Sequence, residues 1–318
     1  MKEQLLRGGS DFEKPKVGIQ RRVYVNGEMV PEEEAKISIF DSAVLIGDSV
    51  LEATRTFNRK LFRWPEHRDR LLRSIKGARL PFEMGPEELD RVTYNFLEDN
   101  LPTLEEGDEC GVGHLMSRGI MGPVSFHTKS TFVMYFYPLA VGLKNKAKYY
   151  DKGLHVVTPP TRHMHPLTVD PKIKYRSRLH FAIADAEAQL VDPEALPLML
   201  DHQGNLAEGT GWNFFVVHRG ELLTPTERNI LQGVSRLTTI ELARGLGMTV
   251  REVDLQPYHA TTADEAFITS TSLCMMPVTQ FNRQVIGEGK PGKWTLRLMD
   301  CWKEHVNFDF LAHAKRCT

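Results

Sequence analysis

The sequence contains few of the features that would assign a function class at once. It has only four cysteines in 318 residues: Cys110, Cys274, Cys301 and Cys317. None of them belongs to a C-x-x-C pair, and their spacing fits neither a zinc site nor a small disulfide framework. We therefore predict free thiols in a reducing compartment, and a cytoplasmic location.

The sequence also has no excess of charge of one sign. Lys and Arg together number 40 and Asp and Glu number 41, which gives a formal net charge of −1. This balance argues against a nucleic-acid-binding protein and against a polybasic membrane anchor. Charged residues at 25% and apolar residues at 41% are ordinary globular values, so a largely disordered chain is excluded.

Long hydrophobic runs and several catalytic motifs are missing as well. The most apolar stretch, residues 132–141, is too short to cross a bilayer and contains Pro138. Residues 1–22 have no apolar segment typical of a secretory signal. Neither G-x-S-x-G nor G-x-x-x-x-G-K-[ST] is present. His163 and His165 stand close together, but the sequence suggests no carboxylate or cysteine partner, so we predict no metal ion.

Length and patterning predict an α+β protein of two domains, with mixed sheets and flanking helices. At about 150 residues per domain, the chain has room for about two. We expect a flexible arm at residues 1–20, a small N-terminal α/β domain at 21–138, and a large C-terminal domain at 154–318. Residues 139–153 are predicted as the interdomain linker, since lysines recur there without a long apolar period.

Local signals predict the individual elements. Asn26-Gly27 between short β-prone runs indicates a hairpin. Apolar residues at helical spacing predict helices, and alternating or β-branched runs predict strands. Helices are expected at 66–80, from 85 onward, at 177–190, 235–246 and 294–306. Strands are expected at 23–25, 28–30, 51–57, 60–63, 112–117, 131–137, 154–158, 196–200, 213–218, 221–224, 249–253, 265–269 and 277–281.

Two ionisable residues stand in contexts that suit chemistry. Lys174 lies between an extended segment and an amphipathic helix, where an inward-pointing amine would lose solvent and have a lowered pKa. Glu208 lies between a turn and a run of small residues that would let a planar ligand approach closely. The alternatives are a solvated lysine and an exposed hairpin glutamate.

Two segments could bind an anion. Gly233 leads into a predicted helix, so the backbone amides of Val234 and Ser235 would be free to meet a phosphate. Residues 269–272 place four hydroxyls after a strand, which also suits phosphate oxygens.

Taken in order, these segments resemble the fold-type IV pyridoxal 5′-phosphate enzymes, the class IV aminotransferases. That group includes branched-chain aminotransferases, D-amino acid transaminases, (R)-amine transaminases and aminodeoxychorismate lyase. The resemblance rests on Tyr-Val-Asn-Gly-Glu at 24–28, Gly-Asp-Ser-Val-Leu-Glu-Ala-Thr-Arg at 47–55, Glu-His-Arg-Asp-Arg-Leu at 66–71, Ile-Lys at 173–174, Ala-Glu-Gly-Thr-Gly-Trp-Asn at 207–213, Leu-Gln-Gly-Val-Ser-Arg at 231–236 and Ala-Asp-Glu-Ala-Phe-Ile-Thr-Ser-Thr at 263–271.

The resemblance implies a role for each matching residue. Lys174 matches the Schiff-base lysine and Glu208 the carboxylate that faces the pyridine nitrogen of the cofactor, pyridoxal 5′-phosphate. Arg70 matches the arginine that holds the cofactor phosphate. The remaining cofactor contacts implied are Leu231 on one face of the ring, and Val234, Ser235, Ser270 and Thr271 around the phosphate.

On the substrate side the sequence departs from the subfamilies. Pro123 stands where D-amino acid and (R)-amine transaminases have an arginine, and the carboxylate-binding arginine of branched-chain enzymes is also missing. We expect Arg178 to take the cofactor O3′ edge or the substrate carboxylate, with Arg55 and His114 as further substrate candidates. If residues 174–178 stay extended, Arg176 would share the face of Lys174 and Arg178.

The expected activity is transfer of an amino group between an amino acid, branched-chain or D, or a primary amine, and a 2-oxo acid. An aminodeoxychorismate lyase-like enzyme that releases pyruvate stays open, as does, more remotely, a cofactor-free binding scaffold. The resemblance further implies a homodimer. We expect no nucleic acid or membrane as a partner.

Overall fold

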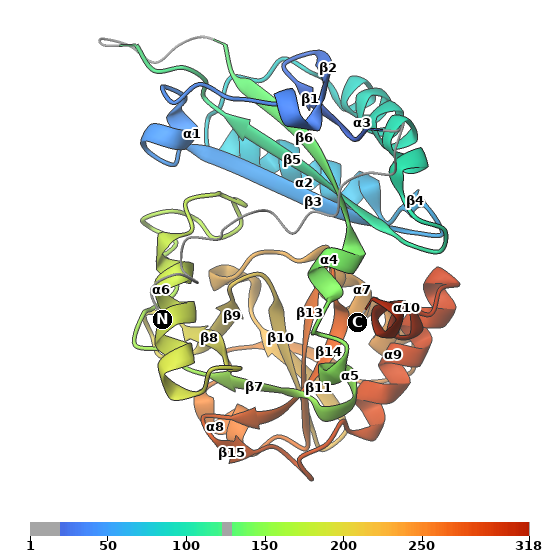
Figure 1. Ribbon diagram of the computed structural model, residues 1–318. Coiled ribbons are helices and arrows are strands. Elements are labelled where there is room, and N and C mark those ends of the chain that lie inside the picture. Colours follow the sequence, from blue (N-terminus) through green and yellow to red (C-terminus); the bar gives the residue numbers. More distant parts are fainter. Residues whose placement is uncertain (1–19, 123–128, 318) are drawn as a thin grey trace, which may run out of the picture.

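The computed structural model describes residues 20–122 and 129–317, which fold as two halves, each built around its own sheet (Figure 1). The flexible arm predicted at 1–20 and the departure at Pro123 lie almost wholly outside these residues. The N-terminal half is drawn in blue to green, and the C-terminal half in green to red. Within the described residues, no helix combines the length and the apolar character needed to cross a bilayer.

The N-terminal half contains a six-stranded sheet in the order β2-β1-β6-β5-β3-β4. Its strands are β1 (Arg22–Val25), β2 (Glu28–Pro31), β3 (Ser49–Phe57), β4 (Lys60–Leu61), β5 (Cys110–Ser117) and β6 (Thr131–Pro138). Its helices are α1 (Ser42–Leu45), α2 (Trp64–Gly77) and α3 (Pro86–Asn100), with 3₁₀ turns at Glu32–Glu34 and Leu101–Thr103. The Asn26-Gly27 hairpin is confirmed. All pairings in this sheet are antiparallel, whereas mixed sheets were predicted.

The C-terminal half contains a nine-stranded sheet that is mixed, as predicted, because β7 and β12 pair in parallel with their neighbours. Its strands are β7 (Leu154–Val157), β8 (Leu196–Leu200), β9 (Leu206–Gly209), β10 (Asn213–His218), β11 (Glu221–Pro225), β12 (Val250–Val253), β13 (Glu265–Ser270), β14 (Cys274–Phe281) and β15 (Gln284–Val285). Its helices are α6 (Leu179–Val191), α7 (Val234–Gly245), α8 (Pro257–Thr261), α9 (Lys293–Val306) and α10 (Phe310–Arg316), with a 3₁₀ turn at Glu227–Asn229.

The segment predicted as a linker contains two short helices, α4 (Leu139–Leu143) and α5 (Lys148–Lys152). Leu143 and Tyr150 are buried in the core of the C-terminal half. Part of this segment therefore belongs to that core and is not only a connection between the halves. Each half has a separate main hydrophobic core. These separate sheets and cores support the domain limits that we propose, 21–138 and 154–318.

Alternation along β5 and β6 gives the small sheet two different faces. Cys110, Val112 and Met116 face the core under α2 and α3. On the opposite face Gly111 and Gly113 leave room for aromatic rings, since a Cβ there would lie 2.1 Å from the rings of Tyr137 and Tyr135. The glycines therefore let two tyrosines lie flat on the face that is turned away from these helices.

Candidate functional site

All the cofactor-binding candidates lie around one cleft. The structure brings together on its wall Arg70, Lys174, Glu208, Leu231, Val234, Ser235, Ser270 and Thr271. They come from α2 in the N-terminal half and from several elements of the C-terminal half. Residues far apart in the sequence thus share one concave site, the usual form of a small-molecule site.

The backbone of Lys174 is fixed by the N-terminal half. Strand β3 is paired with β4 only at Thr56 and Phe57, which leaves an edge free at its beginning. Along this edge the amide of Leu51 donates to the carbonyl of Lys174 at 2.9 Å, and the amide of Lys174 donates to the hydroxyl of Ser74 at 3.0 Å. The lysine is therefore held at a defined position between the two halves.

The amine of Lys174 has the lowered pKa that its sequence context predicts. Burial, and next the positive charge of Arg70, lower the pKa of Lys174 to about 8. Within the described residues its Nζ has neither a hydrogen bond nor an ion pair with a side chain or carbonyl. An amine with this pKa is neutral in a substantial fraction of molecules near pH 8, and a neutral amine can act as nucleophile or base.

Glu208 on β9 is surrounded by donors. It lies directly opposite Asn213 of β10, whose Nδ2 donates to Oε2 at 3.0 Å. The amide of Leu231 donates to Oε1 at 3.1 Å. The Nε2 atom of His163, a side chain only 1% exposed, lies 3.1 Å from the same Oε1 without hydrogen-bond alignment. The expectation that His163 has no carboxylate partner was therefore wrong.

Arg70 is held by a buried carboxylate. Glu52 on β3 accepts from Arg70 Nε at 2.8 Å and Nη2 at 2.6 Å, and lies 2.8 Å from His67 Nδ1. Burial would raise the pKa of Glu52, but the charge and hydrogen bonds of Arg70, aided by His67, outweigh it and hold that pKa well below its usual range. Arg70 Nη1 also donates to the carbonyl of Gln232 at 2.9 Å, which ties α2 to the loop before α7.

The beginning of α7 forms one end of the cleft. Gly233 is its N-cap and supplies no side-chain cap, so the amides of Val234 and Ser235 are available to a ligand. A Cβ at Gly233 would lie 2.1 Å from Oδ1 of Asn213, so glycine is needed there. Beside it, the Oγ1 of Thr269 is buried with no hydrogen-bond partner in the described structure. Uncapped amides, an unpaired hydroxyl and a guanidinium together suit a phosphate.

The substrate candidates are divided by the structure. Arg178 lines the cleft, donates to the carbonyl of Thr210, and lies 4.3 Å above the ring of Phe181. Arg176 is exposed, and Tyr175 lines the cleft in its place, because α6 begins directly after Arg178 and the segment does not stay extended. The shared face predicted for Arg176 was therefore wrong.

Arg55 and His114 do not line this cleft. Arg55 is 2% exposed and donates to the carbonyls of Thr56 and Ser272, which joins β3 to the turn before β14. His114 faces the core under α2 and stacks on Trp64, with ring centroids 4.9 Å apart. Burial lowers its pKa to about 3, so it stays neutral.

Several residues of the site escaped the sequence reasoning. Thr269, Asn213 and His163 carry no local motif of their own. Outside the cleft wall, the tyrosines Tyr135 and Tyr137 alternate along β6 with core residues at period two, so their shared face could have been predicted from the sequence. Burial raises the pKa of both phenols, so both hydroxyls are protonated at neutral pH.

Comparisons with known proteins agree with this geometry. Residues 49–281 match the family model described as amino-transferase class IV. The chain is 33% identical over 287 residues to branched-chain-amino-acid aminotransferase-like protein 2 of Arabidopsis thaliana, covering 88% of this chain and 49% of that protein. It thus spans about half the length of that relative. It is 29% identical over 284 residues to a putative branched-chain-amino-acid aminotransferase of Methanocaldococcus jannaschii, covering 89% of this chain and 96% of that protein.

A solved structure has the same fold. The branched-chain amino acid aminotransferase of Escherichia coli superposes with a TM-score of 0.80 at 27% identity, covering 90% of this chain and 94% of that chain. The predicted two-domain, fold-type IV architecture is therefore confirmed. The matched region includes every residue on the wall of the cleft. This chain belongs to the class IV aminotransferase family.

Proposed function

We propose that this protein is a pyridoxal 5′-phosphate-dependent aminotransferase that moves an amino group between an amino acid and a 2-oxo acid. The observation that carries the proposal is the meeting of Lys174, Glu208 and Arg70 at one cleft. The branched-chain aminotransferases among its relatives make branched-chain amino acids the first donors to test.

The residues present fit this cofactor. Arg70, the amides of Val234 and Ser235, and the unpaired hydroxyl of Thr269 offer donors to a phosphate. Leu231 offers an apolar contact to a ring, and Glu208 an acceptor for a protonated ring nitrogen. When bound, the cofactor supplies an aldehyde for attachment of an amine and a ring that accepts electrons.

Lys174 and Glu208 divide the acid–base work. The amine of Lys174 would attach the cofactor. It would afterwards take the proton from the substrate α-carbon and return it to the carbon that carried the cofactor's aldehyde. Glu208 would keep a proton on the ring nitrogen. The three groups around its carboxylate hold it in one orientation.

The proposal is tested by reconstituting the purified protein with pyridoxal 5′-phosphate. We expect a visible absorbance band that Lys174→Ala removes, and bleaching of that band by branched-chain amino acids in a half-reaction. A panel of D-amino acids and of (R)- and (S)-amines decides the donor class. Pyruvate released without any amino acceptor would instead favour the lyase. A protein that never acquires the band would contradict the proposal.

We propose Arg178 as a substrate-carboxylate contact. Of the two arginines on the described cleft wall, Arg70 is already paired with the carboxylate of Glu52, whereas Arg178 donates to a backbone carbonyl. Burial lowers the pKa of Arg178, and the positive charge of Arg176 adds to the effect. A bound anion would offset this burial and repulsion and so stabilise the guanidinium. Arg178→Gln should raise the KM for amino acids while the visible band is retained. Unchanged KM and turnover on amino acids would remove Arg178 from this role.

We also propose a homodimer. An apolar patch around α1 is exposed on the N-terminal half: Ile39, Phe40, Val44, Leu45, Ile46 and Ile120 are each at least half exposed. Such patches mark interfaces between proteins. The patch continues into Gly47, whose carbonyl accepts a hydrogen bond from Ser177 beside the cleft, so a second copy would lie near the site. Light scattering should give a dimer mass, and Phe40→Glu should reduce it.

The cytoplasmic location stays a prediction. All four cysteines are unpaired, as expected of a reducing compartment.

A further inference from the structure

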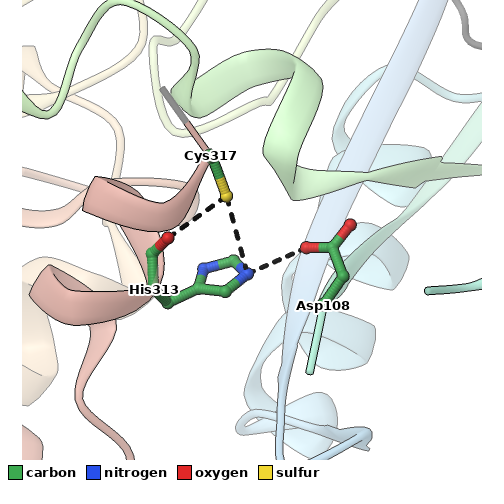
Figure 2. A group of neighbouring side chains, drawn as sticks. All are labelled: Asp108, His313 and Cys317. Atoms are coloured by element: carbon green, nitrogen blue, oxygen red, sulfur yellow. Dashed lines mark hydrogen bonds and ion pairs between the residues drawn. The ribbon is translucent and has the colours of Figure 1, made fainter. Parts of the chain in front are cut away.

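Three side chains with metal-binding atoms meet far from the cleft. Asp108 precedes β5 in the N-terminal half, while His313 lies on α10 and Cys317 directly follows that helix. Figure 2 shows them pointing toward one another. One atom from each lies within 4.8 Å of the others. His313 is 2% exposed, and the other two are partly buried.

The geometry distinguishes a metal site from a catalytic triad. In a Cys-His-Asp triad the imidazole uses one nitrogen for the cysteine and the other for the carboxylate. Here Asp108 Oδ1 at 2.8 Å and Cys317 Sγ at 3.9 Å both approach Nε2 of His313 (Figure 2). Nδ1 is buried with no hydrogen-bond partner in the described structure. Two ligand atoms gathered at one ring nitrogen suit coordination better than a proton relay.

We propose that Asp108, His313 and Cys317 bind one Zn²⁺ ion through a carboxylate oxygen, Nε2 and Sγ. The combination of thiolate, imidazole and carboxylate is one that zinc accepts, with water in the fourth position. This site was not predicted, because the cysteine spacings carry no zinc motif and Asp108 is remote in sequence.

The three ligand atoms already lie within 4.8 Å of one another, so side-chain movement alone can close them around an ion. Around a tetrahedral zinc the ligand nitrogen and oxygen stand about 3.3 Å apart, and nitrogen and sulfur about 3.6 Å. The observed 2.8 Å must therefore open and the 3.9 Å close by a few tenths of an ångström. The Oδ2 of Asp108 has no hydrogen bond among the described residues, while Oδ1 already accepts from the amide of Glu109. Oδ2 can therefore turn toward an ion.

Charge balances on binding. Cys317 is a free cysteine, so its sulfur must lose a proton to become a thiolate ligand. Binding breaks its S–H bond, releases one proton to solvent and forms an S–Zn bond, with no change in oxidation state. Thiolate and carboxylate then neutralise the two charges of the ion. Because Asp108 and α10 belong to different halves of the chain, the ion would cross-link them.

The test uses the full-length protein, dialysed against a chelator and then titrated with Zn²⁺ or Co²⁺. At a free Zn²⁺ concentration of about 1 µM we expect one ion per chain by elemental analysis. Co²⁺ should produce a near-ultraviolet thiolate charge-transfer band, measured as a difference spectrum. Cys317→Ser and Asp108→Asn should each weaken binding at least tenfold, and Zn²⁺ should raise the Tm of the unmodified protein but not of these two variants.

Cys301→Ser is the matched control, since Cys301 is also partly buried but lies on α9 outside this group. It should retain one ion and the charge-transfer band. The proposal is overturned if the unmodified protein binds no ion at this concentration, if Cys317→Ser binds as tightly, or if Co²⁺ binds without the thiolate band. These measurements do not depend on aminotransferase activity.

Discussion

The buried group of Glu52, Arg70 and His67 allows a quantitative prediction. Glu52 is fully buried and forks Arg70 with two hydrogen bonds of 2.6 and 2.8 Å. Glu52→Gln keeps the shape but removes the negative charge, which leaves the guanidinium of Arg70 without a counter-ion in a buried site. Removing one partner of a buried ion pair costs about 3–5 kcal/mol, and the remaining amide hydrogen bond puts this variant near about 3 kcal/mol.

The pH dependence follows from the direction of the pKa shift. The pKa of Glu52 is lowered in the folded protein from a usual value of 4.5. The stability that its charge contributes is therefore fully present above pH 4.5 and is lost as the pH falls below it. The difference in the free energy of unfolding between the unmodified protein and Glu52→Gln should stay constant from pH 8 to about 5. It should shrink in more acidic buffer.

Thermal unfolding measures the loss. In a chain of this size, about 3 kcal/mol corresponds to a fall in Tm of about 4–5 °C. Pyridoxal 5′-phosphate should raise the Tm of Glu52→Gln by more than it raises the Tm of the unmodified protein. The reason is that its phosphate would supply the missing counter-charge to Arg70. Glu88→Gln, which breaks an exposed pair with Arg91, should change the Tm by less than about 1 °C. A Tm for Glu52→Gln within that margin would refute the reasoning.

Three further predictions concern the cleft. The rate at which cofactor-free protein attaches pyridoxal 5′-phosphate should rise with pH, with a midpoint near 8, because only the neutral amine of Lys174 reacts. Stopped-flow absorbance measures this rate. A rate that does not change with pH would contradict the lowered pKa. Gly233→Ala places a Cβ 2.1 Å from Asn213 Oδ1 and should weaken cofactor affinity at least about tenfold in a fluorescence titration. His163→Leu removes the ring beside Glu208 and should weaken cofactor affinity in the same titration, whereas His163→Gln should weaken it less.

Local patterns were sufficient to predict the parts of the fold that depend on neighbours in sequence. The hairpin at Asn26-Gly27 and the long helices α7 and α9 lie where turn residues and apolar spacing placed them. Strand β9 was missed because four residues are too few to show a period, although it carries Glu208. The alternation of Tyr135 and Tyr137 with core residues along β6 was also present in the sequence. It was used only to predict a strand, and not to predict that the two tyrosines share one face.

Contacts between distant segments could not be predicted in the same way. Lys174 and Glu208 were identified from their surroundings and from the family resemblance, but His163 reaches Glu208 only through the folding of the loop before α6. Arg55 and His114 were named as further substrate candidates, but a residue type does not say which face of a strand its side chain occupies. The structure directs Arg55 to backbone carbonyls and His114 to the core. Register and face, rather than residue type, decided these cases.

The cleft exists only when the two halves of the chain are packed together. Arg70 comes from the N-terminal half but donates to Gln232 of the C-terminal half, and the backbone of Lys174 is held by Leu51 and Ser74 across the same boundary. A ligand that bridges Arg70 and the amides of α7 would therefore stabilise the packing as well as occupy the site. The burial that lowers the pKa of Lys174 has the same origin, since it depends on both halves excluding water. Binding strength and amine reactivity should consequently fall together in variants that loosen this boundary, even where no residue of the cleft wall is changed.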